Sequence, residues 1–412
     1  RLPGLWVGRL LVLIFLSCLC LGSVAGCQLA EERSRRGSID WSRGQKLGQA
    51  ALNNSPALEV DAATGQTYVA WIAEEGETFY LRFVHLDSAG YVLAQRDLPF
   101  DVSAPSKVRL AASGAGGLYV AWIDSFAEGR ALFWARIDEE GNQESSPTRL
   151  SPPGAVVDSH TIGRGGDGSV HIFWGVGEGE GKGLYHARLT GDTAGSPVFL
   201  KERGFAPTFR VDATGTIQVA WQEEPSFGEG SIHYATFDAQ EATLLAPHEL
   251  ASFSAPLGVI IHGPELGLTH DSVYVIWSSE VRGGGLTLPA AESYYVTFPL
   301  GQPQMAQRPQ DIELPATNDP LYQTVDTAFN VQQLAPARTL PGASFVYMPS
   351  AIRASEKGLA VAFAVELVGR TKSIIQPVLT LWREGKMQHY QIVSKTRNVS
   401  LRPSLLADAA NN

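Results

Sequence analysis

The chain is poor in cysteine and carries no excess of positive charge. Its 412 residues include three cysteines. Cys18 and Cys20 lie in an apolar N-terminal stretch that we predict to be removed, so Cys27 is left without a disulfide partner. Lys and Arg number 32 against 42 Asp and Glu, a net charge of −10. We expect no nucleic-acid partner, because nucleic-acid binding requires a basic surface.

Motifs for metal or phosphate binding are also missing. The nine histidines are scattered, with no His-x-x-x-His or Cys-x-x-Cys spacing. His262 and His270, with the adjacent Asp271, come nearest to a metal site, but histidines satisfied by the core are the simpler interpretation. Residues 175–183 are rich in glycine, but they open no helix and their acidic side chains would repel phosphate. We therefore predict no metal and no cofactor.

What the chain does contain is a repeat of about fifty residues, centred on a Val-Ala-Trp tripeptide. Self-similarity at this period is typical of stacked units, none of which can bury its apolar faces alone. The aromatic position of successive copies is held by Trp71, Trp122, Trp174, Trp221, Trp277 and Phe363.

Each copy contains four segments with the alternating pattern of a β-strand. In the clearest copy the second strand places Ile217, Val219 and Trp221 on one face and Ala220 on the other. The apolar period is two and nowhere a sustained 3.6, which excludes a helical solenoid. Four-stranded units in radial array describe a β-propeller, so the predicted fold class is all-β. In that copy the strands are predicted at 207–212, 216–222, 231–237 and 243–250.

The predicted propeller occupies residues 45–412, with six full repeats and a partial one. A Pro-rich insertion falls at about 299–343, where prolines exclude central strands. Residues 45–52 resemble the fourth strand of a repeat unit whose other strands do not precede it, and residues 401–408 resemble the first strand of another unit. We expect the chain to be a fragment of a seven-bladed parent.

The N-terminus predicts export. A basic start, a short apolar run and the tetrapeptide Val-Ala-Gly-Cys ending at Cys27 match the lipobox of bacterial lipoprotein signal peptides. Residues 1–26 are then the signal peptide and residues 27–44 a polar tether, and Cys27 carries a lipid anchor on the outer side of a bacterial membrane. Two alternatives stay open: cleavage by ordinary signal peptidase, or an uncleaved membrane anchor.

The repeat resembles that of sialidase-like propellers of the Asp-box type. After the third strand, the turns at Asp87–Gly90 and Asp138–Gly141 keep the aspartate and glycine of that box without its aromatic residue. The carboxylate can still bond to the backbone of its own turn, so we predict a structural role.

The resemblance implies a channel lined by first strands, where catalytic sialidases hold a carboxylate with three arginines. Arg109, Arg210 and Arg353 fall on predicted first strands, although not at equivalent places in their repeats, and could bind a carboxylate. Structural ion pairs are the alternative. The arginine-bearing element and the Tyr/Glu pair of catalytic sialidases are not matched, so no catalytic residue is assigned.

Acidic residues recur in the loops that join second and third strands. An exposed collar of this kind would attract cations or a basic partner, whereas the simpler interpretation is that loops are polar for solubility. The predicted acidic rim consists of Glu74, Glu75, Asp124, Glu128, Glu223, Glu224 and Glu280.

These observations favour a surface-anchored, non-catalytic propeller that binds or scaffolds a glycan or an envelope protein. The first alternative is a sialidase-like glycoside hydrolase whose missing blade supplies the absent residues. The second is a purely structural spacer. These three functions can be told apart only by the residues of the functional site, because one fold supports many functions.

Overall fold

The structure of the protein is a computed structural model, and its described residues are all-β apart from one short 3-10 helix, η1 (Pro303–Met305). The chain divides into two compact units, Arg1–Leu47 and Gly48–Asn412. The predicted signal peptide, tether and Cys27 lie outside the described residues, as do 401–408 and most of the insertion. No helix in the described part is long and apolar enough to cross a membrane. The structure describes residues 46–392 except 52–53, 62–63, 114–115, 179–180, 225–228, 239–242, 255–258, 282–289, 313–344, 356–357, 369–372 and 384–385.

The strands of the second unit form antiparallel sheets in chain order. The first sheet contains β1 (Ala57–Val60), β2 (Thr67–Glu75), β3 (Thr78–Leu86) and β4 (Val92–Asp97). The second contains β5 (Pro105–Ala112), β6 (Leu118–Phe126), β7 (Gly129–Ile137) and β8 (Thr148–Arg149). The third contains β9 (Val156–Arg164), β10 (Val170–Glu178), β11 (Gly183–Thr190), β12 (Thr193–Ala194) and β13 (Val198–Lys201), and a parallel bridge from β7 to β9 joins it to the second.

The remaining strands follow the same plan. The fourth sheet contains β14 (Gly204–Val211), β15 (Ile217–Glu223), β16 (Glu229–Phe237) and β17 (Thr243–Ser254). The fifth contains β18 (Val259–Leu268), β19 (Ser272–Val281), β20 (Ala290–Pro299) and β21 (Gln310–Asp311). The sixth contains β22 (Phe345–Ser355), β23 (Gly358–Val368), β24 (Ser373–Arg383) and β25 (Lys386–Ile392).

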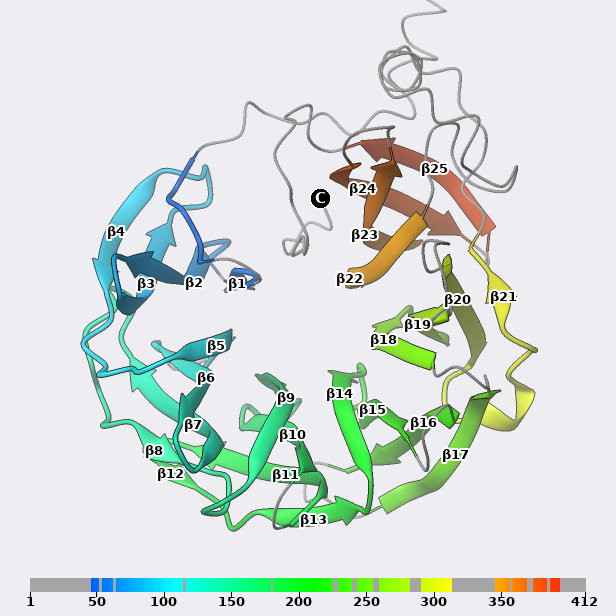
Figure 1. Cartoon of the computed structure of the whole chain (residues 1–412), viewed down its shortest axis with the longest axis horizontal. Coiled ribbons are helices and arrows are strands. Elements are labelled where there is room, and N and C mark those ends of the chain that lie inside the picture. Colours follow the sequence, from blue (N-terminus) through cyan, green and yellow to red (C-terminus); the bar gives the residue numbers. More distant parts are fainter. Residues whose placement is uncertain are drawn as a thin grey trace, which may run out of the picture. The chain divides into compact units, whose positions relative to one another are not determined.

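The first strand of each sheet lies nearest the middle of the fold. Contacts run from β1 to β5, then to β9, β14, β18 and β22, so the inner strands surround a common axis (Figure 1). The later strands of each sheet lie farther out. This arrangement confirms the predicted all-β propeller. The seventh blade stays a prediction.

The Val-Ala-Trp repeat works as predicted, through the pairing of small and large residues between neighbouring sheets. Ala70 packs in the same core cluster as Trp122, and Ala121 in the same cluster as Trp174. Ala220 shares a cluster with Trp277 in the same way. Because a large residue on one sheet meets a small one on the next, the two faces interlock at the density of a protein interior.

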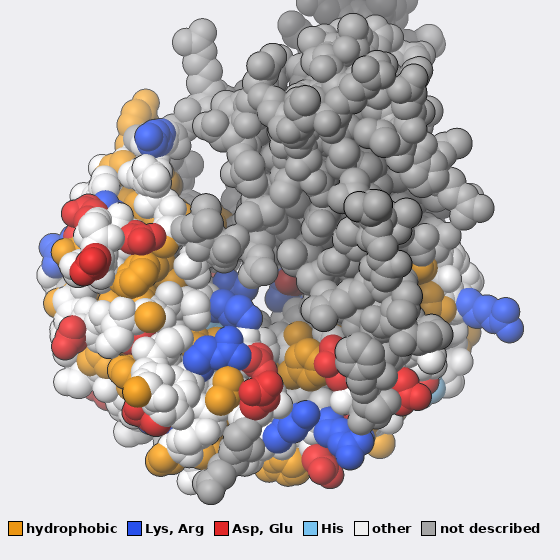
Figure 2. Space-filling model, in the orientation of Figure 1, with side chains coloured by type: hydrophobic (Ala, Val, Ile, Leu, Met, Phe, Trp, Pro, Cys, Tyr) orange, Lys and Arg blue, Asp and Glu red, His pale blue; other side chains and the backbone are white. Residues whose placement is uncertain are grey.

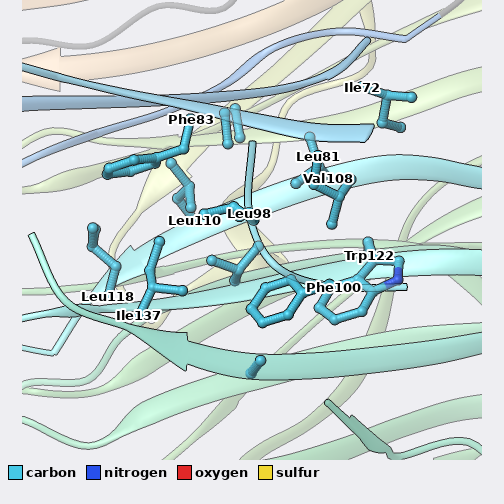
Figure 3. Close-up of a cluster of buried hydrophobic side chains, with 14 of the residues drawn as sticks. Ile72, Leu81, Phe83, Leu98, Phe100, Val108, Leu110, Leu118, Trp122 and Ile137 are labelled. Carbon is cyan, nitrogen blue, oxygen red and sulfur yellow. The ribbon is translucent and has the colours of Figure 1, made fainter. Parts of the chain in front are cut away.

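Figure 3 shows this contact between the first two sheets, where Trp122 lies beside Phe100 from the connecting segment. The two rings are stacked, with centroids 5.2 Å apart and an interplanar angle of 9°. Leu81 and Val108, fully buried, pack around them. Stability therefore comes from stacked sheet faces rather than from cross-links.

The degenerate Asp boxes have the structural role that the sequence predicts. The Asp87 Oδ1 atom accepts hydrogen bonds from the amides of Ala89 and Tyr91, at 2.9 and 2.8 Å. The Asp138 Oδ1 atom accepts from the amides of Glu140 and Asn142, at 3.0 and 2.7 Å. Each carboxylate fixes its own turn between a third and a fourth strand.

Candidate functional site

The inner strands place their side chains in registered rows around the axis. In one row, each residue pairs with the alanine position of the Val-Ala-Trp strand in its own sheet, and this row contains Arg109 and Glu265. The next row lies two residues along and contains Glu59, Arg210 and Arg353. Arg210 and Arg353 are therefore at equivalent places, while Arg109 lies in the other row, so the three arginines together are not equivalent. The Arg353 side chain is outside the described residues.

Several inner strands contain a β-bulge near their first residues, opposite the repeat tryptophan of the neighbouring strand. It forces a positive φ on Lys107 (53°), Ala206 (48°) and Gly263 (104°). Glycine adopts this conformation freely, but in Lys107 and Ala206 it costs about 1–3 kcal/mol and must be held by neighbours. The Lys107 amide donates to the Asn54 Oδ1 atom at 3.3 Å, from the preceding sheet. Such strained backbone is characteristic of functional sites.

Two neighbouring inner strands bring three titratable residues near one another at this bulge, and we call Lys107, Arg109 and His160 the channel cluster. Lys107 and Arg109 come from β5, and His160 comes from the neighbouring inner strand β9. Both cations lie close enough to the imidazole to disfavour its protonation. The His160 side chain is 5% exposed, and within the described part of the chain neither ring nitrogen makes a hydrogen bond of good geometry, although the Ala121 backbone lies close enough to act on the ring.

The position of His160 is apolar in most other sheets. In its own sheet, His160 directly precedes the residue that pairs with the alanine position of the Val-Ala-Trp strand. In four of the other sheets the corresponding residue is Pro56, Val108, Pro207 or Pro264. An unpartnered buried polar group is costly, by about 1–3 kcal/mol, so packing alone would favour proline or valine there. His160 thus breaks the repeat at a cost in stability, which points to a functional role.

The buried imidazole is held in its neutral form. Burial lowers the pKa of His160 well below its usual value of 6.5, and Arg109 and Lys107 lower it further. The Ala121 backbone offsets this shift only in part. The two cations attract an anion, and a bound anion offsets their charge, so that the neutral imidazole can then accept a proton.

This shift predicts a pH dependence of stability. In the unfolded chain His160 takes up a proton below about pH 6.5, whereas the folded protein does not, so the free energy of unfolding should decrease as the pH falls through that range. His160→Gln should flatten this dependence by up to about 1.4 kcal/mol per pH unit. Urea unfolding at a series of pH values measures the effect. Equal slopes for the two proteins would contradict it.

A second charged group lies farther along the channel, around Arg210. Burial lowers the pKa of Arg210, while the carboxylates of Glu265 and Glu59 act in the opposite direction. Glu59 also accepts a hydrogen bond from the Ala112 amide at 3.2 Å. Arg210 comes from β14, Glu265 from the adjacent β18 and Glu59 from β1, so residues distant in sequence converge here.

Charged residues also gather at the rim above the channel cluster. Arg130 forms an ion pair with Asp158, and Lys107 donates a hydrogen bond to the Asp158 carbonyl oxygen. Glu224 is exposed at the rim, but desolvation by its neighbours raises the pKa of its carboxyl, with Asp158 acting in the same direction and Lys182 in the opposite one. Figure 2 shows one face of the molecule, on which Lys and Arg side chains lie near the central opening with Asp and Glu side chains beside them. The channel opening is therefore of mixed charge rather than uniformly acidic.

The residues of the predicted acidic rim have diverse environments. Glu74, Glu75, Glu128 and Glu224 are exposed, and Glu75 pairs with Arg82 at 3.0 Å. The Glu280 side chain is outside the described residues.

Two members of the predicted rim are engaged inside the fold. Asp124 is 2% exposed and accepts hydrogen bonds from the amides of Ser103 (3.0 Å) and Ala104 (2.7 Å), which fixes the segment entering β5. Glu223 accepts from the Trp221 indole N–H at 3.0 Å and lies 3.6 Å from the Lys201 ammonium. These two carboxylates are structural.

Sequence reasoning did not single out Lys107 or His160. The histidines were interpreted as scattered core residues, and Lys107 carries no motif. The available signal was positional: His160 stands where the other repeats have mostly proline or valine. Recognising this position required the strand register, because a bulge in a first strand changes which of its residues pair with the Val-Ala-Trp strand.

Comparison with known proteins gives matches at the level of structure alone. No protein-family model and no curated protein matches the chain. A polysaccharide lyase of family PL25, an ulvan lyase bound to -[GlcA(1-4)Rha3S]-, is similar with a TM-score of 0.53 and 10% identity over 84% of each chain. The polysaccharide lyase Uly1 has a TM-score of 0.48 at 10% identity, over 87% of this chain and 86% of its own. An endo-arabinase from Bacteroides thetaiotaomicron has a TM-score of 0.32 at 14% identity, over 58% and 92%.

These comparisons correct one prediction. The interpretation as a non-catalytic binding or scaffolding module is contradicted, because solved structures that share this fold include polysaccharide lyases of family PL25, at TM-scores of 0.53 and 0.52. The sialidase type is not supported by any family match.

Proposed function

We propose that this protein is a carbohydrate-degrading enzyme that cleaves an acidic polysaccharide at the channel opening. The observation that carries the proposal is the channel cluster, in which a neutral, buried histidine lies beside two cations at a strained backbone position. The similar PL25 lyase, whose structure contains a GlcA unit, supports an acidic sugar as the substrate class.

The cluster fits β-elimination next to a uronate carboxylate. Lys107 and Arg109 bind the carboxylate and stabilise the negative charge that develops when the adjacent C–H bond breaks. His160 takes that proton, once the sugar displaces the groups that cover its ring. A carbon–carbon double bond forms as the glycosidic C–O bond breaks. The leaving oxygen takes a proton, for which Glu224 is the candidate donor because it is accessible at the rim and desolvation raises its pKa.

A glycoside hydrolase is the second candidate. Hydrolysis uses two carboxyl groups, one as an acid and one as a base or nucleophile. Glu59 and Glu265 both lie near Arg210 in the channel and offer such a pair. In this case Arg210 would orient the substrate, and no double bond would form.

Product analysis tests the proposal and separates the two chemistries. The protein is incubated with uronate-containing polysaccharides and with neutral polysaccharides as controls. We expect the uronate-containing chains to be shortened, with the ultraviolet absorbance of an unsaturated uronate at the new ends. Shortened chains without that absorbance would favour hydrolysis. No shortening of any acidic chain would contradict the proposal.

A further inference from the structure

The structure contains a pocket at the other end of the inner strands, away from the bulges. It lies between the fourth and fifth sheets, beside the tight turn that joins β14 to β15, and has a volume of about 340 Å³. Asp212 and Gln218 from the fourth sheet contribute to its lining, together with Leu300 from the segment after β20. This volume falls within the range of small-molecule sites.

The polar side of the pocket is held rigidly. The Asp212 Oδ1 atom accepts hydrogen bonds from the Thr214 amide and hydroxyl, at 2.8 and 2.6 Å. Its Oδ2 atom accepts from the Gln218 amide nitrogen at 2.7 Å. Gln218, 2% exposed, in turn accepts a hydrogen bond from the fully buried Tyr234 hydroxyl. The carboxylate is therefore fixed before any ligand arrives.

The pocket is negatively charged, and part of its hydrogen-bonding capacity is unused. Within the described part of the chain, no Lys or Arg forms an ion pair with Asp212. The Thr236 hydroxyl also lines the pocket, and it makes no hydrogen bond to another described residue. A ligand hydroxyl could donate to Asp212 and accept from Thr236.

The other side of the pocket is apolar. Leu244, 58% exposed, and the half-buried Leu245 and Leu300 form this wall. Exposed leucine beside fixed polar groups suits a ligand with one apolar face and a hydroxylated edge, which describes a sugar ring. An acidic sugar would be repelled by Asp212.

We propose that this pocket binds one neutral sugar residue, as a second carbohydrate site separate from the channel cluster. The proposal goes beyond the catalytic function and does not depend on it. A neutral residue of a mixed polysaccharide would bind here, whereas the channel opening attracts the acidic ones. Such a site would raise the residence time of the polymer on the protein without taking part in bond cleavage.

Ligand-observed NMR with matched sugars tests the proposal. The probes are glucose and galactose, each compared with its uronate. We expect saturation transfer to at least one neutral sugar and about a tenfold weaker signal in Thr236→Val and in Leu244→Glu. Leu93→Glu, which changes another exposed leucine on β4, is the matched control and should bind as the wild type does.

The outcomes separate this site from the catalytic one. Binding of neutral sugars that is lost in Thr236→Val, with polysaccharide cleavage unchanged, would support the second site. Neutral-sugar binding without any cleavage would leave the pocket standing and overturn the catalytic proposal. Absence of binding to either neutral sugar, or equal binding in Thr236→Val and Leu244→Glu, would overturn the pocket.

Discussion

Replacement of His160 by glutamine is expected to lower kcat on an acidic polysaccharide by about 10²–10⁴-fold, the usual contribution of a general base. Glutamine fits a buried polar position but cannot take up a proton at neutral pH. Steady-state kinetics on the polysaccharide that the wild type cleaves best would measure the loss. Because His160 makes no hydrogen bond in the described structure, the fold should tolerate the change.

Arg109→Gln should lower kcat/KM by about 10²–10³-fold, because it removes one donor to the developing negative charge. Matched controls come from the first sheet. His85 is a buried histidine stacked on Tyr68, and Arg82 is a half-buried arginine paired with Asp97. His85→Gln and Arg82→Gln should keep activity, since neither residue lies on an inner strand. Full activity of His160→Gln would refute the proposed base, and a loss in all four variants would indicate a general structural effect.

The second large effect concerns stability. Trp174→Ala should lower the free energy of unfolding by about 3–5 kcal/mol, because it leaves a cavity between the second and third sheets. Trp174 is fully buried and stacks on Tyr185, with ring centroids 5.5 Å apart. Chemical denaturation followed by circular dichroism would measure the change. Tyr91→Ala, at a position 72% exposed, should stay within about 0.5 kcal/mol of the wild type.

Two phenylalanine variants separate packing from hydrogen bonding. The Trp174 indole N–H makes no hydrogen bond to a described residue, whereas that of Trp221 donates to Glu223 at 3.0 Å. Trp221→Phe should therefore cost about 1 kcal/mol more than Trp174→Phe, through the lost hydrogen bond to a charged group. Phe363 at the equivalent position of the sixth sheet shows that the repeat accepts a smaller ring. A larger loss in Trp174→Phe would contradict this account.

Local patterns in the sequence were enough to predict the architecture. Apolar residues alternate with a period of two along the Val-Ala-Trp strands, and the aspartate of each Asp-Gly turn bonds to the backbone of that turn. Residues close in sequence therefore determine both features. Pairing Ala121 with Trp174 follows from the same repeat, because most copies carry alanine before the aromatic residue, although the third copy has Phe173 there and the fifth has Ile276.

The site was decided by the tertiary structure. A bulge near Lys107 changes the register of β5, and contact with β9 then brings His160 beside Lys107 and Arg109. Asp124 has the sequence context of an exposed loop acid, yet it is buried because the segment that enters β5, the inner strand of its own sheet, folds over it. The sequence by itself determined a stack of repeated sheets, because the alternation of apolar residues that specifies each strand lies within that strand. Which charges meet at the axis depends on contacts between sheets about fifty residues apart, and only the packed propeller provides them.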